Sequence, residues 1–287
     1  MQGRVIKGIG GFYYISHDGQ VIQGTARGIL KRGSDILYVG DIVNYEMIGD
    51  DEFVITEVIE RRNFLERPPV SNLDKLIVTF AAAHPEPNFY VIDKLCVGAE
   101  VRGIDVVICI TKSDLVADDI INQYANRFRG AYPVVPVCAL TGAGVDGLTD
   151  QIHGSNAVLA GASGVGKSTL LNRLVGTDAA EVGSISDKRK RGRHTTRSVC
   201  IYELPGGTNI YDTPGFSSLD VPFLEKTEIA RYFPEFRLLR GNCRYSDCIH
   251  VNEPDCAVKD AVARGDIDPS RYASYKMMLE EVAKWQK

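Results

Sequence analysis

Residues 161–168 read Gly161-Ala162-Ser163-Gly164-Val165-Gly166-Lys167-Ser168 and fill the pattern G-x-x-x-x-G-K-S. The preceding residues, 156–160, form a short apolar run typical of a buried strand. The following residues, 169–175, carry aliphatic side chains at helical spacing. A glycine-rich loop between a strand and a helix is the context of a phosphate-binding loop, whereas a plain glycine-rich turn before a helix would not need the Lys-Ser pair.

The chemistry of this loop depends on its backbone and on a few side chains. Glycines let the chain turn its N–H groups toward an anion, and the start of the helix adds a partial positive charge. Lys167 is expected to reach the β- and γ-phosphates of a nucleotide, and the Ser168 hydroxyl to ligate Mg²⁺. Thr169 completes the predicted nucleotide-binding set of this loop.

The composition excludes several classes of protein. Of 287 residues, 44% are hydrophobic and 24% are charged, which is ordinary for a soluble globular chain. No apolar run approaches the roughly 18 residues that a membrane span needs, and the N-terminus has no apolar signal segment. The odd number of cysteines, 7, argues against a disulfide framework. We therefore expect a cytoplasmic protein without membrane contact, whose net charge of −4 leaves nucleic-acid binding to local basic patches.

Residues 1–67 read as a separate domain of short strands. Turn signals separate β-compatible runs at 5–9, 12–16, 21–26, 36–39, 43–47 and 53–58. Strands this short and this regularly spaced predict a small closed β-barrel. An OB-type barrel, which commonly binds oligonucleotides, is one interpretation, and an SH3-like barrel or a docking module is the alternative.

A second domain, residues 68–220, follows a pair of prolines. Buried strands are predicted at 76–80, 106–110 and 134–137, with helices at 88–102 and 118–128 between them. This alternation predicts a doubly wound α/β sheet, which binds ligands at the carboxyl ends of its strands. At two of these ends the chain places Thr111-Lys112-Ser113-Asp114 and Cys138-Ala139-Leu140.

The Thr-Lys-Ser-Asp loop predicts which base is bound. The Asp114 carboxylate can accept hydrogen bonds from the N1–H and the 2-amino group of guanine, a pair of donors that adenine does not offer. Lys112 would pack along the base or brace the phosphate loop, and the Ala139 N–H could reach the guanine oxygen. Together with the phosphate loop, these positions predict a site for GTP and GDP.

A basic stretch, residues 188–197, follows the phosphate-loop helix and is too polar to belong to a core. Its lysines and arginines are expected to contact RNA phosphates. Two strands come next, at 198–203 and 209–211, and the second delivers Asp212 and Gly215 in the pattern D-x-x-G. Asp212 suits the acidic position of a Mg²⁺ shell, and the Gly215 N–H could bind a γ-phosphate.

The third domain, residues 221–287, is predicted to be helical with a metal site. Cys243, Cys248, His250 and Cys256 offer three thiolates and one imidazole within a short segment. Such a set matches a closed, tetrahedral, structural Zn²⁺ site with one ion per chain, although the spacing differs from that of the common C-x-x-C finger.

The remaining apolar features are predicted to be core. The other cysteines lie in or beside apolar segments, at Cys96, Cys109, Cys138 and Cys200. An apolar stripe at helical spacing closes the chain, with Met278, Leu279, Val282 and Trp285. Such a stripe is more typical of core or of a domain contact than of a binding face.

The order of the motifs is unusual. Here T-K-S-D and C-A-L precede the phosphate loop, which precedes the threonine loop and D-T-P-G, whereas most GTPases begin with the phosphate loop. The chain therefore looks circularly permuted, which is possible where termini lie close together at a surface. The barrel, this order, the Arg-Gly-Arg-His-Thr-Thr loop at 191–196 and the Cys/His cluster together resemble the RsgA (YjeQ/YloQ) family of small-subunit-dependent GTPases, over essentially the whole chain.

The resemblance implies an activity and partners. It implies a GTP-hydrolysing factor of late small-subunit assembly that binds the subunit and its rRNA, is stimulated by it, and acts as a monomer with Mg²⁺ and Zn²⁺. By the same resemblance Mg²⁺ is held by Ser168, Asp212 and Thr196, with Thr195 as the alternative to Thr196. Lys167 serves both phosphate binding and catalysis.

The attacking water needs a side chain to orient it. Phe216 follows D-T-P-G, where many GTPases have a glutamine, and an aromatic ring cannot orient water. The resemblance assigns this role to His194, whose neutral imidazole can accept a hydrogen bond from water. The catalytic set is therefore predicted to be His194, Lys167 and Thr196.

Two interpretations from other classes stay open. A P-loop phosphotransferase acting on a small molecule is opposed by T-K-S-D, because that motif selects guanine. A zinc-dependent RNA-binding module, whose affinity is switched by nucleotide, would bind ribosomes without turnover.

Overall fold

The protein is described here by a computed structural model, which covers residues 1–17, 20–28, 36–49, 51–182, 199–221 and 225–285. These residues form two compact units. The first contains Met1–Leu76, Thr149–Leu159 and Ser168–Phe216, and the second contains Ile77–Leu148, Ala160–Lys167 and Ser217–Lys287. Among the described residues, every helix is too short or too polar to cross a membrane.

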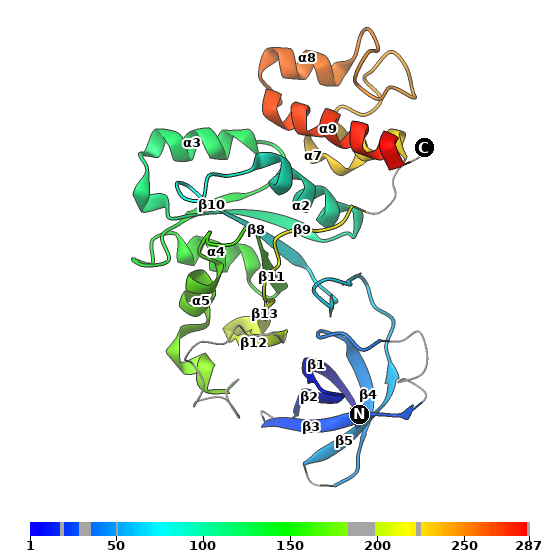
Figure 1. Cartoon of the computed structure of the whole chain (residues 1–287), viewed down its shortest axis with the longest axis vertical. Coiled ribbons are helices and arrows are strands. Elements are labelled where there is room, and N and C mark those ends of the chain that lie inside the picture. The colour runs from blue at the N-terminus through cyan, green and yellow to red at the C-terminus, as the bar shows by residue number, and fades with distance from the viewer. Residues whose placement is uncertain (18–19, 29–35, 50, 183–198, 222–224, 286–287) are drawn as a thin grey trace. The chain divides into compact units, whose positions relative to one another are not determined.

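The N-terminal strands of the first unit close into a barrel (Figure 1). They are β1 (Gln2–Ile9), β2 (Phe12–His17), β3 (Gln20–Ala26), β4 (Ile42–Met47) and β5 (Glu52–Val58). Their order is β1-β2-β3-β5-β4, and β1 also pairs with β4, which closes the sheet on itself. Strands β3 and β5 run parallel, and the other pairs within the barrel are antiparallel. This five-stranded closed arrangement confirms the predicted OB-type barrel.

The predicted strand at 36–39 is wrong. Within it, Val39 forms only an isolated bridge to Val70, and residues 36–38 have no strand partner. The chain turns sharply at Gly40, which has φ 100°, and the Asp41 side chain accepts a hydrogen bond from Tyr38 N at 2.8 Å. Because this turn redirects the backbone, the apolar run cannot continue into a sheet ladder.

The rest of the first unit extends from the barrel into a second group of strands. The elements are the hairpin β6 (Phe64–Leu65) and β7 (Val70–Ser71), then β11 (Asn156–Ala160), α5 (Lys167–Val182), β12 (Cys200–Leu204) and β13 (Thr208–Asp212). Strand β13 runs parallel to β11 and antiparallel to β12, and β12 pairs with β1 of the barrel. Within α5, Gly176 has a non-helical φ of 69°. A short 3-10 turn, Pro205–Gly207, joins β12 to β13.

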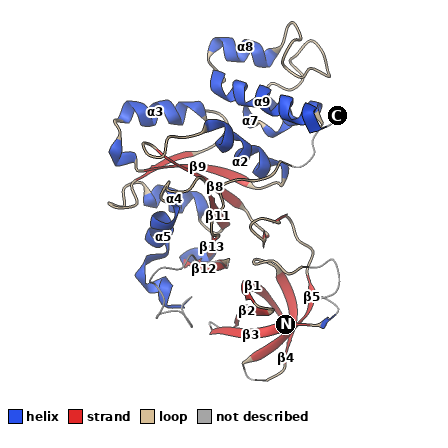
Figure 2. Ribbon diagram, in the orientation of Figure 1, coloured by secondary structure: helices blue, strands red, loops and turns tan. Residues whose placement is uncertain are grey.

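The second unit begins with strands that alternate with helices (Figure 2). The strands are β8 (Lys75–Ala81), β9 (Asp105–Thr111) and β10 (Val134–Val137), in the order β10-β9-β8. The helices are α2 (Phe89–Val101), the 3-10 turn η1 (Ser113–Leu115), α3 (Asp118–Arg127) and the first half of α4 (Val145–Ile152), whose second half belongs to the first unit. Residues 76–81 and 106–111 are buried on both faces, as the continuous apolar runs predicted.

The C-terminal part of the second unit is helical. Its elements are α6 (Lys226–Ile229), η3 (Ala230–Tyr232), α7 (Pro234–Arg237), α8 (Ala257–Arg264) and α9 (Pro269–Trp285). Met278 and Leu279 of the predicted stripe are buried and share a core with Phe233 and Phe236. Among the other cysteines, Cys96, Cys109 and Cys138 are buried as expected, but Cys200 is only half-buried.

A buried ionic cluster links α2, α3, α7 and α9 inside the second unit. The Arg271 guanidinium is 1% exposed and donates to Asp93 Oδ1 at 2.7 Å and to Glu235 Oε1 at 2.8 Å. Asp93 also accepts a hydrogen bond from Arg127. Both carboxylates are therefore neutralised within the core by charge-assisted hydrogen bonds.

Candidate nucleotide-binding edge and metal cluster

The phosphate loop follows β11 and leads into α5. Gly164 and Gly166 have φ values of 80° and 100°, which side chains rarely allow. A Cβ at Gly161 would lie 2.0 Å from Thr79 O, so only glycine fits there. The Lys167 ammonium donates to Gly161 O at 2.6 Å and to Ala162 O at 2.8 Å, and burial lowers the pKa of Lys167. The lysine thus lies folded over the loop, and both its ammonium and the N–H groups of the loop are available to donate to a phosphate.

The T-K-S-D loop is attached to the phosphate loop. Lys112 donates to Gly164 O at 2.9 Å and also bonds to His84 O. The buried Thr111 hydroxyl lies within hydrogen-bond distance of Val165 O and Phe80 O. These contacts place the two motifs at one edge of the second unit and hold Lys112 as a brace, one of its two predicted roles.

The C-A-L loop leaves the sheet at the same edge. Parallel strands β9 and β10 pair Thr111 with Val137, so the residues after both strands emerge together. Cys138 is buried and bonds to Ala143 O through its N–H at 2.9 Å, whereas Leu140 is 78% exposed. Asp114 and Leu140 both face solvent, where a base could lie.

The sequence interpretation missed the glycines that shape the C-A-L loop. Gly142 and Gly144 have φ values of 90° and 76°, and a Cβ at Gly144 would lie 2.0 Å from Pro136 O. The signal was present as the G-x-G that follows Cys-Ala-Leu-Thr. His84 O was also missed, because a main-chain acceptor leaves no trace in the residue types.

The first unit contains the remaining described candidates. Ser168 and Thr169 are exposed in the first turn of α5. Asp212 ends β13 opposite Cys200 of β12, and burial raises the pKa of the Asp212 carboxyl. Gly215 has φ 69°, and Phe216 is 3% exposed. His194, Thr195, Thr196 and the basic stretch 188–197 lie outside the described residues.

The Cys/His cluster has the geometry of a four-ligand metal site. The ligand atoms of Cys243, Cys248, His250 and Cys256 all lie within 4.8 Å of one another. His250 Nδ1 lies 3.6, 3.4 and 3.3 Å from the sulfurs of Cys243, Cys248 and Cys256, and the sulfurs of Cys243 and Cys256 are 3.9 Å apart.

These spacings can be compared with those around zinc. A tetrahedral Zn²⁺ with ordinary bond lengths holds two sulfurs about 3.8 Å apart and a nitrogen about 3.6 Å from a sulfur. The cluster therefore has the donor set and the size that Zn²⁺ requires.

Neighbouring side chains hold the loop that carries His250. Tyr272 donates its hydroxyl to His250 O at 2.6 Å, and Tyr275 donates to Ile249 O at 2.7 Å. The Glu253 carboxylate accepts from Val251 N at 2.9 Å, and such main-chain N–H groups lower the pKa of Glu253. His250 has φ 60°, so these bonds stabilise a backbone conformation that histidine adopts rarely.

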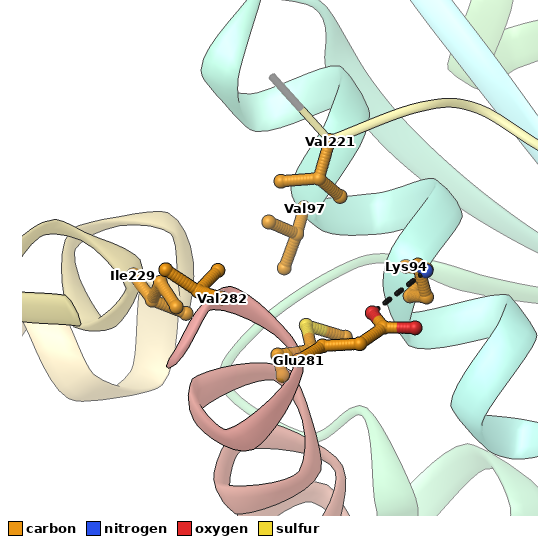
Figure 3. Close-up of a pocket in the computed structure, with 7 residues that line it drawn as sticks. Lys94, Val97, Val221, Ile229, Glu281 and Val282 are labelled. Carbon is orange, nitrogen blue, oxygen red and sulfur yellow. Dashed lines mark hydrogen bonds and ion pairs between the residues drawn. The ribbon is translucent and has the colours of Figure 1, made fainter. Parts of the chain in front are cut away.

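A small hollow elsewhere in the second unit differs from the nucleotide-binding edge in chemistry (Figure 3). It is lined by Lys94, Val97, Val221, Ile229, Met278, Glu281 and Val282. Its polar groups are paired with each other, because Lys94 Nζ lies 2.8 Å from Glu281 Oε2. The rest of the lining is apolar and offers no cradle for a phosphate.

The phosphate loop, the T-K-S-D loop braced on it and the order of these motifs in the chain define a circularly permuted P-loop GTPase. Comparison of the sequence with known protein families narrows this class of GTPase to one family. The RsgA GTPase family matches residues 58–222 and the RsgA N-terminal domain matches residues 2–55. The chain belongs to the RsgA GTPase family.

Relatives cover the chain almost completely. It is 41% identical to the small ribosomal subunit biogenesis GTPase RsgA of Caldanaerobacter subterraneus subsp. tengcongensis, over 100% of this chain and 97% of that protein. The RsgA of Carboxydothermus hydrogenoformans is 41% identical over 98% of each chain.

Solved structures agree in fold. The crystal structure of YjeQ from Thermotoga maritima has a TM-score of 0.82 and 34% identity, covering 98% of both chains. YloQ, described as a circularly permuted GTPase, has a TM-score of 0.77 and 34% identity, covering 100% of this chain and 96% of its own.

Proposed function

We propose that this GTPase acts on the small ribosomal subunit late in its maturation, binds the subunit and its rRNA, and hydrolyses GTP faster when bound. Two kinds of observation support this. Relatives that match the whole chain carry the name small ribosomal subunit biogenesis GTPase. The bond from Lys112 to Gly164 O, which joins the base-selecting loop to the phosphate loop, is the single observation that carries the nucleotide assignment.

The base and the phosphates are assigned to the predicted residues. Asp114 accepts from the guanine N1–H and 2-amino group, and the Ala139 N–H donates to the guanine oxygen. The main chain from Gly161 to Gly166 binds phosphate oxygens, and Lys167 moves from the carbonyls it now contacts to the β- and γ-phosphates. This exchange requires Lys167 to give up two main-chain carbonyl acceptors, those of Gly161 and Ala162.

Oxygen donors suit Mg²⁺ at the predicted position. Asp212 is a partly buried carboxylate whose pKa is raised by desolvation, and a bound cation would favour its ionised form. Ser168 supplies a hydroxyl at the start of α5, and Thr196 supplies a second hydroxyl. Hydroxyl and carboxylate oxygens are the ligands that Mg²⁺ prefers, and an ion held by them would supply positive charge beside the phosphates.

Hydrolysis requires an oriented water. Phe216 is buried, so its ring packs into the protein interior and cannot take the place of a water-orienting glutamine. His194 accepts a hydrogen bond from the water in our proposal, while Gly215 N–H and Lys167 stabilise the γ-phosphate. Because His194 lies in the basic stretch, binding of that stretch to rRNA would couple the subunit to the residue that orients the water.

The other parts of the chain have supporting roles. We assign residues 1–67 to an RNA-binding barrel, 68–220 to the GTPase domain and 221–287 to a domain held by one structural Zn²⁺. The protein acts in the cytoplasm as a monomer. The basic residues 188–193 supply phosphate contacts in a chain of net charge −4.

One experiment tests the proposal directly. GTP turnover is measured with and without purified small subunits, with large subunits as the control. We expect stimulation by small subunits alone. Binding without turnover would favour the RNA-binding module, and transfer of phosphate to a small molecule would favour the phosphotransferase.

A further inference from the structure

Tyr211 lies directly before Asp212 in β13, and 0% of its surface is exposed. A phenylalanine would fill the same space, so the hydroxyl needs a separate explanation. This hydroxyl donates to Ser71 O at 3.2 Å. Burial raises the pKa of Tyr211 well above its ordinary value, so the group remains a neutral donor.

The socket that receives Tyr211 belongs to the barrel and the segment after it. Gly40 has φ 100°, and a Cβ there would lie 2.6 Å from Tyr211 Oη and 2.3 Å from Ser71 O. Glycine is therefore required for the ring to approach. The Gly40 N–H donates to Val5 O in β1 at 2.8 Å, which attaches the socket to a barrel strand.

A buried carboxylate fixes the socket. Asp41 is 0% exposed and accepts from Ser71 Oγ at 2.6 Å and from Arg61 Nε at 2.7 Å. The same carboxylate accepts from Tyr38 N at 2.8 Å. Because these bonds involve an ionised group in the interior, they are strong and directional.

Other contacts tie the same strands to the barrel. Asn156 Oδ1 accepts from Arg4 of β1 at 2.9 Å and from Asn209 of β13 at 3.0 Å. Lys7 of β1 pairs with Cys200, which in turn pairs with Asp212. The end of β13 is thus held both through the sheet and through the Tyr211 side chain.

We propose that Tyr211 is a positioning residue for the Mg²⁺ site, because its anchored ring and hydroxyl fix the strand end that presents Asp212. Consecutive Cα atoms are about 3.8 Å apart, so a shift of Tyr211 passes directly to Asp212. The two side chains point to opposite faces of the strand, which lets one bind the socket while the other stays available. This inference rests on the proposed role of Asp212 as a Mg²⁺ ligand.

The test removes only the hydroxyl, with Tyr211→Phe. The control is Tyr90→Phe, which loses the bond from Tyr90 to Glu281 Oε2 at 2.8 Å, away from β13. The Mg²⁺ concentration that half-saturates GTP hydrolysis is measured without ribosomal subunits, together with KM for GTP at saturating Mg²⁺ and the thermal unfolding midpoint. We expect Tyr211→Phe to raise the half-saturating Mg²⁺ concentration roughly 3- to 10-fold, the effect of one hydrogen bond. KM for GTP should stay unchanged.

The outcomes separate this inference from the proposed function. Wild-type Mg²⁺ dependence in folded Tyr211→Phe protein overturns it. An equal shift in Tyr90→Phe also overturns it, because the shift would then follow general stability. Unaltered Mg²⁺ dependence in Asp212→Asn overturns both this inference and the role of Asp212. Absence of stimulation by subunits overturns the proposed partner alone.

Discussion

The metal cluster and the nucleotide-binding edge stabilise their polar groups in opposite ways. The four ligands of the cluster face one another within 4.8 Å and come from a short segment. At the edge, Lys112 and Lys167 are bonded to main-chain carbonyls, and Asp114 faces solvent. We expect a bound metal ion to hold the four ligands of the cluster together, whereas the edge is already formed by the protein. The comparison predicts that one site belongs to folding and the other to binding.

The largest expected effect is loss of the metal. Binding of structural Zn²⁺ contributes about 10–16 kcal/mol in small zinc domains, so Cys256→Ser or a strong chelator should unfold the loop around the cluster. Elemental analysis should find one Zn per chain in the untreated protein. Hydrogen exchange across residues 237–265 is the measurement, and nucleotide removal is the matched control. A metal-free protein with full protection there would break the comparison.

A change of base selectivity comes next. Asp114→Asn should weaken GTP binding by about 10⁴-fold and favour xanthine nucleotides, because the donor and acceptor pattern at the base is inverted. The unfolding midpoint should not change, since Asp114 is exposed. Asp118→Asn, an exposed carboxylate in the first turn of α3, is the control. Competition binding with GTP and XTP checks it, and equal GTP affinity in wild type and Asp114→Asn would refute the assignment.

The buried ionic cluster around Arg271 differs from the metal cluster, because it joins helices through ion pairs and not through a metal ion. Arg271→Met leaves Asp93 and Glu235 without their shared partner, which should cost about 3–5 kcal/mol in the free energy of unfolding. Arg264→Met is the matched control, because Arg264 and Asp266 form a pair with 60% and 61% of their side chains exposed. Urea unfolding of zinc-loaded protein measures both. Equal midpoints for the two variants would mean that the cluster is not a structural anchor.

Catalysis should depend on His194, which lies outside the residues that the structure describes. His194→Ala should lower subunit-stimulated turnover by about 10²-fold, which is what a positioned acid–base group contributes, and leave GTP affinity nearly unchanged. Intrinsic turnover should fall less. Ser168→Ala is the control and should reduce turnover in both conditions. Normal stimulated turnover in a His194→Ala protein that still binds subunits would contradict this prediction. The attacking water would then be oriented by backbone groups or by the ribosome.

The smallest effect concerns Asp212 and pH. Because burial raises the pKa of this carboxyl in the folded protein, ionising it opposes folding, and stability falls as pH rises through the folded pKa. Asp212→Asn removes this penalty, so without Mg²⁺ the variant should unfold at an equal or higher temperature at neutral pH. The difference should vanish at pH values below the unfolded pKa, where both states bind the proton. Thermal unfolding across pH measures this, and a less stable variant at neutral pH would contradict it.

The sequence predicted the periodic elements well. Apolar runs such as β8 and β9 were found because both faces are buried, and the phosphate-loop context followed from its neighbours. The strand prediction for 36–39 failed because apolar β-compatible residues do not reveal the turn at Gly40. That turn lets the Tyr211 ring approach the backbone at Gly40. Main-chain acceptors such as His84 O also have no signature in the residue types.

Short-range chemistry was determined by the sequence alone. The positions of the glycines, the Lys-Ser pair and the ligands from Cys243 to Cys256 fix local backbone shape and donor type, because these depend on neighbours in the chain. Only the tertiary structure decided which distant groups meet. Arg4 reaches Asn156, Tyr211 reaches Ser71, and Arg271 reaches Asp93 across 178 residues. Such contacts arise from strand register and the burial of charge, which no local pattern of residues specifies.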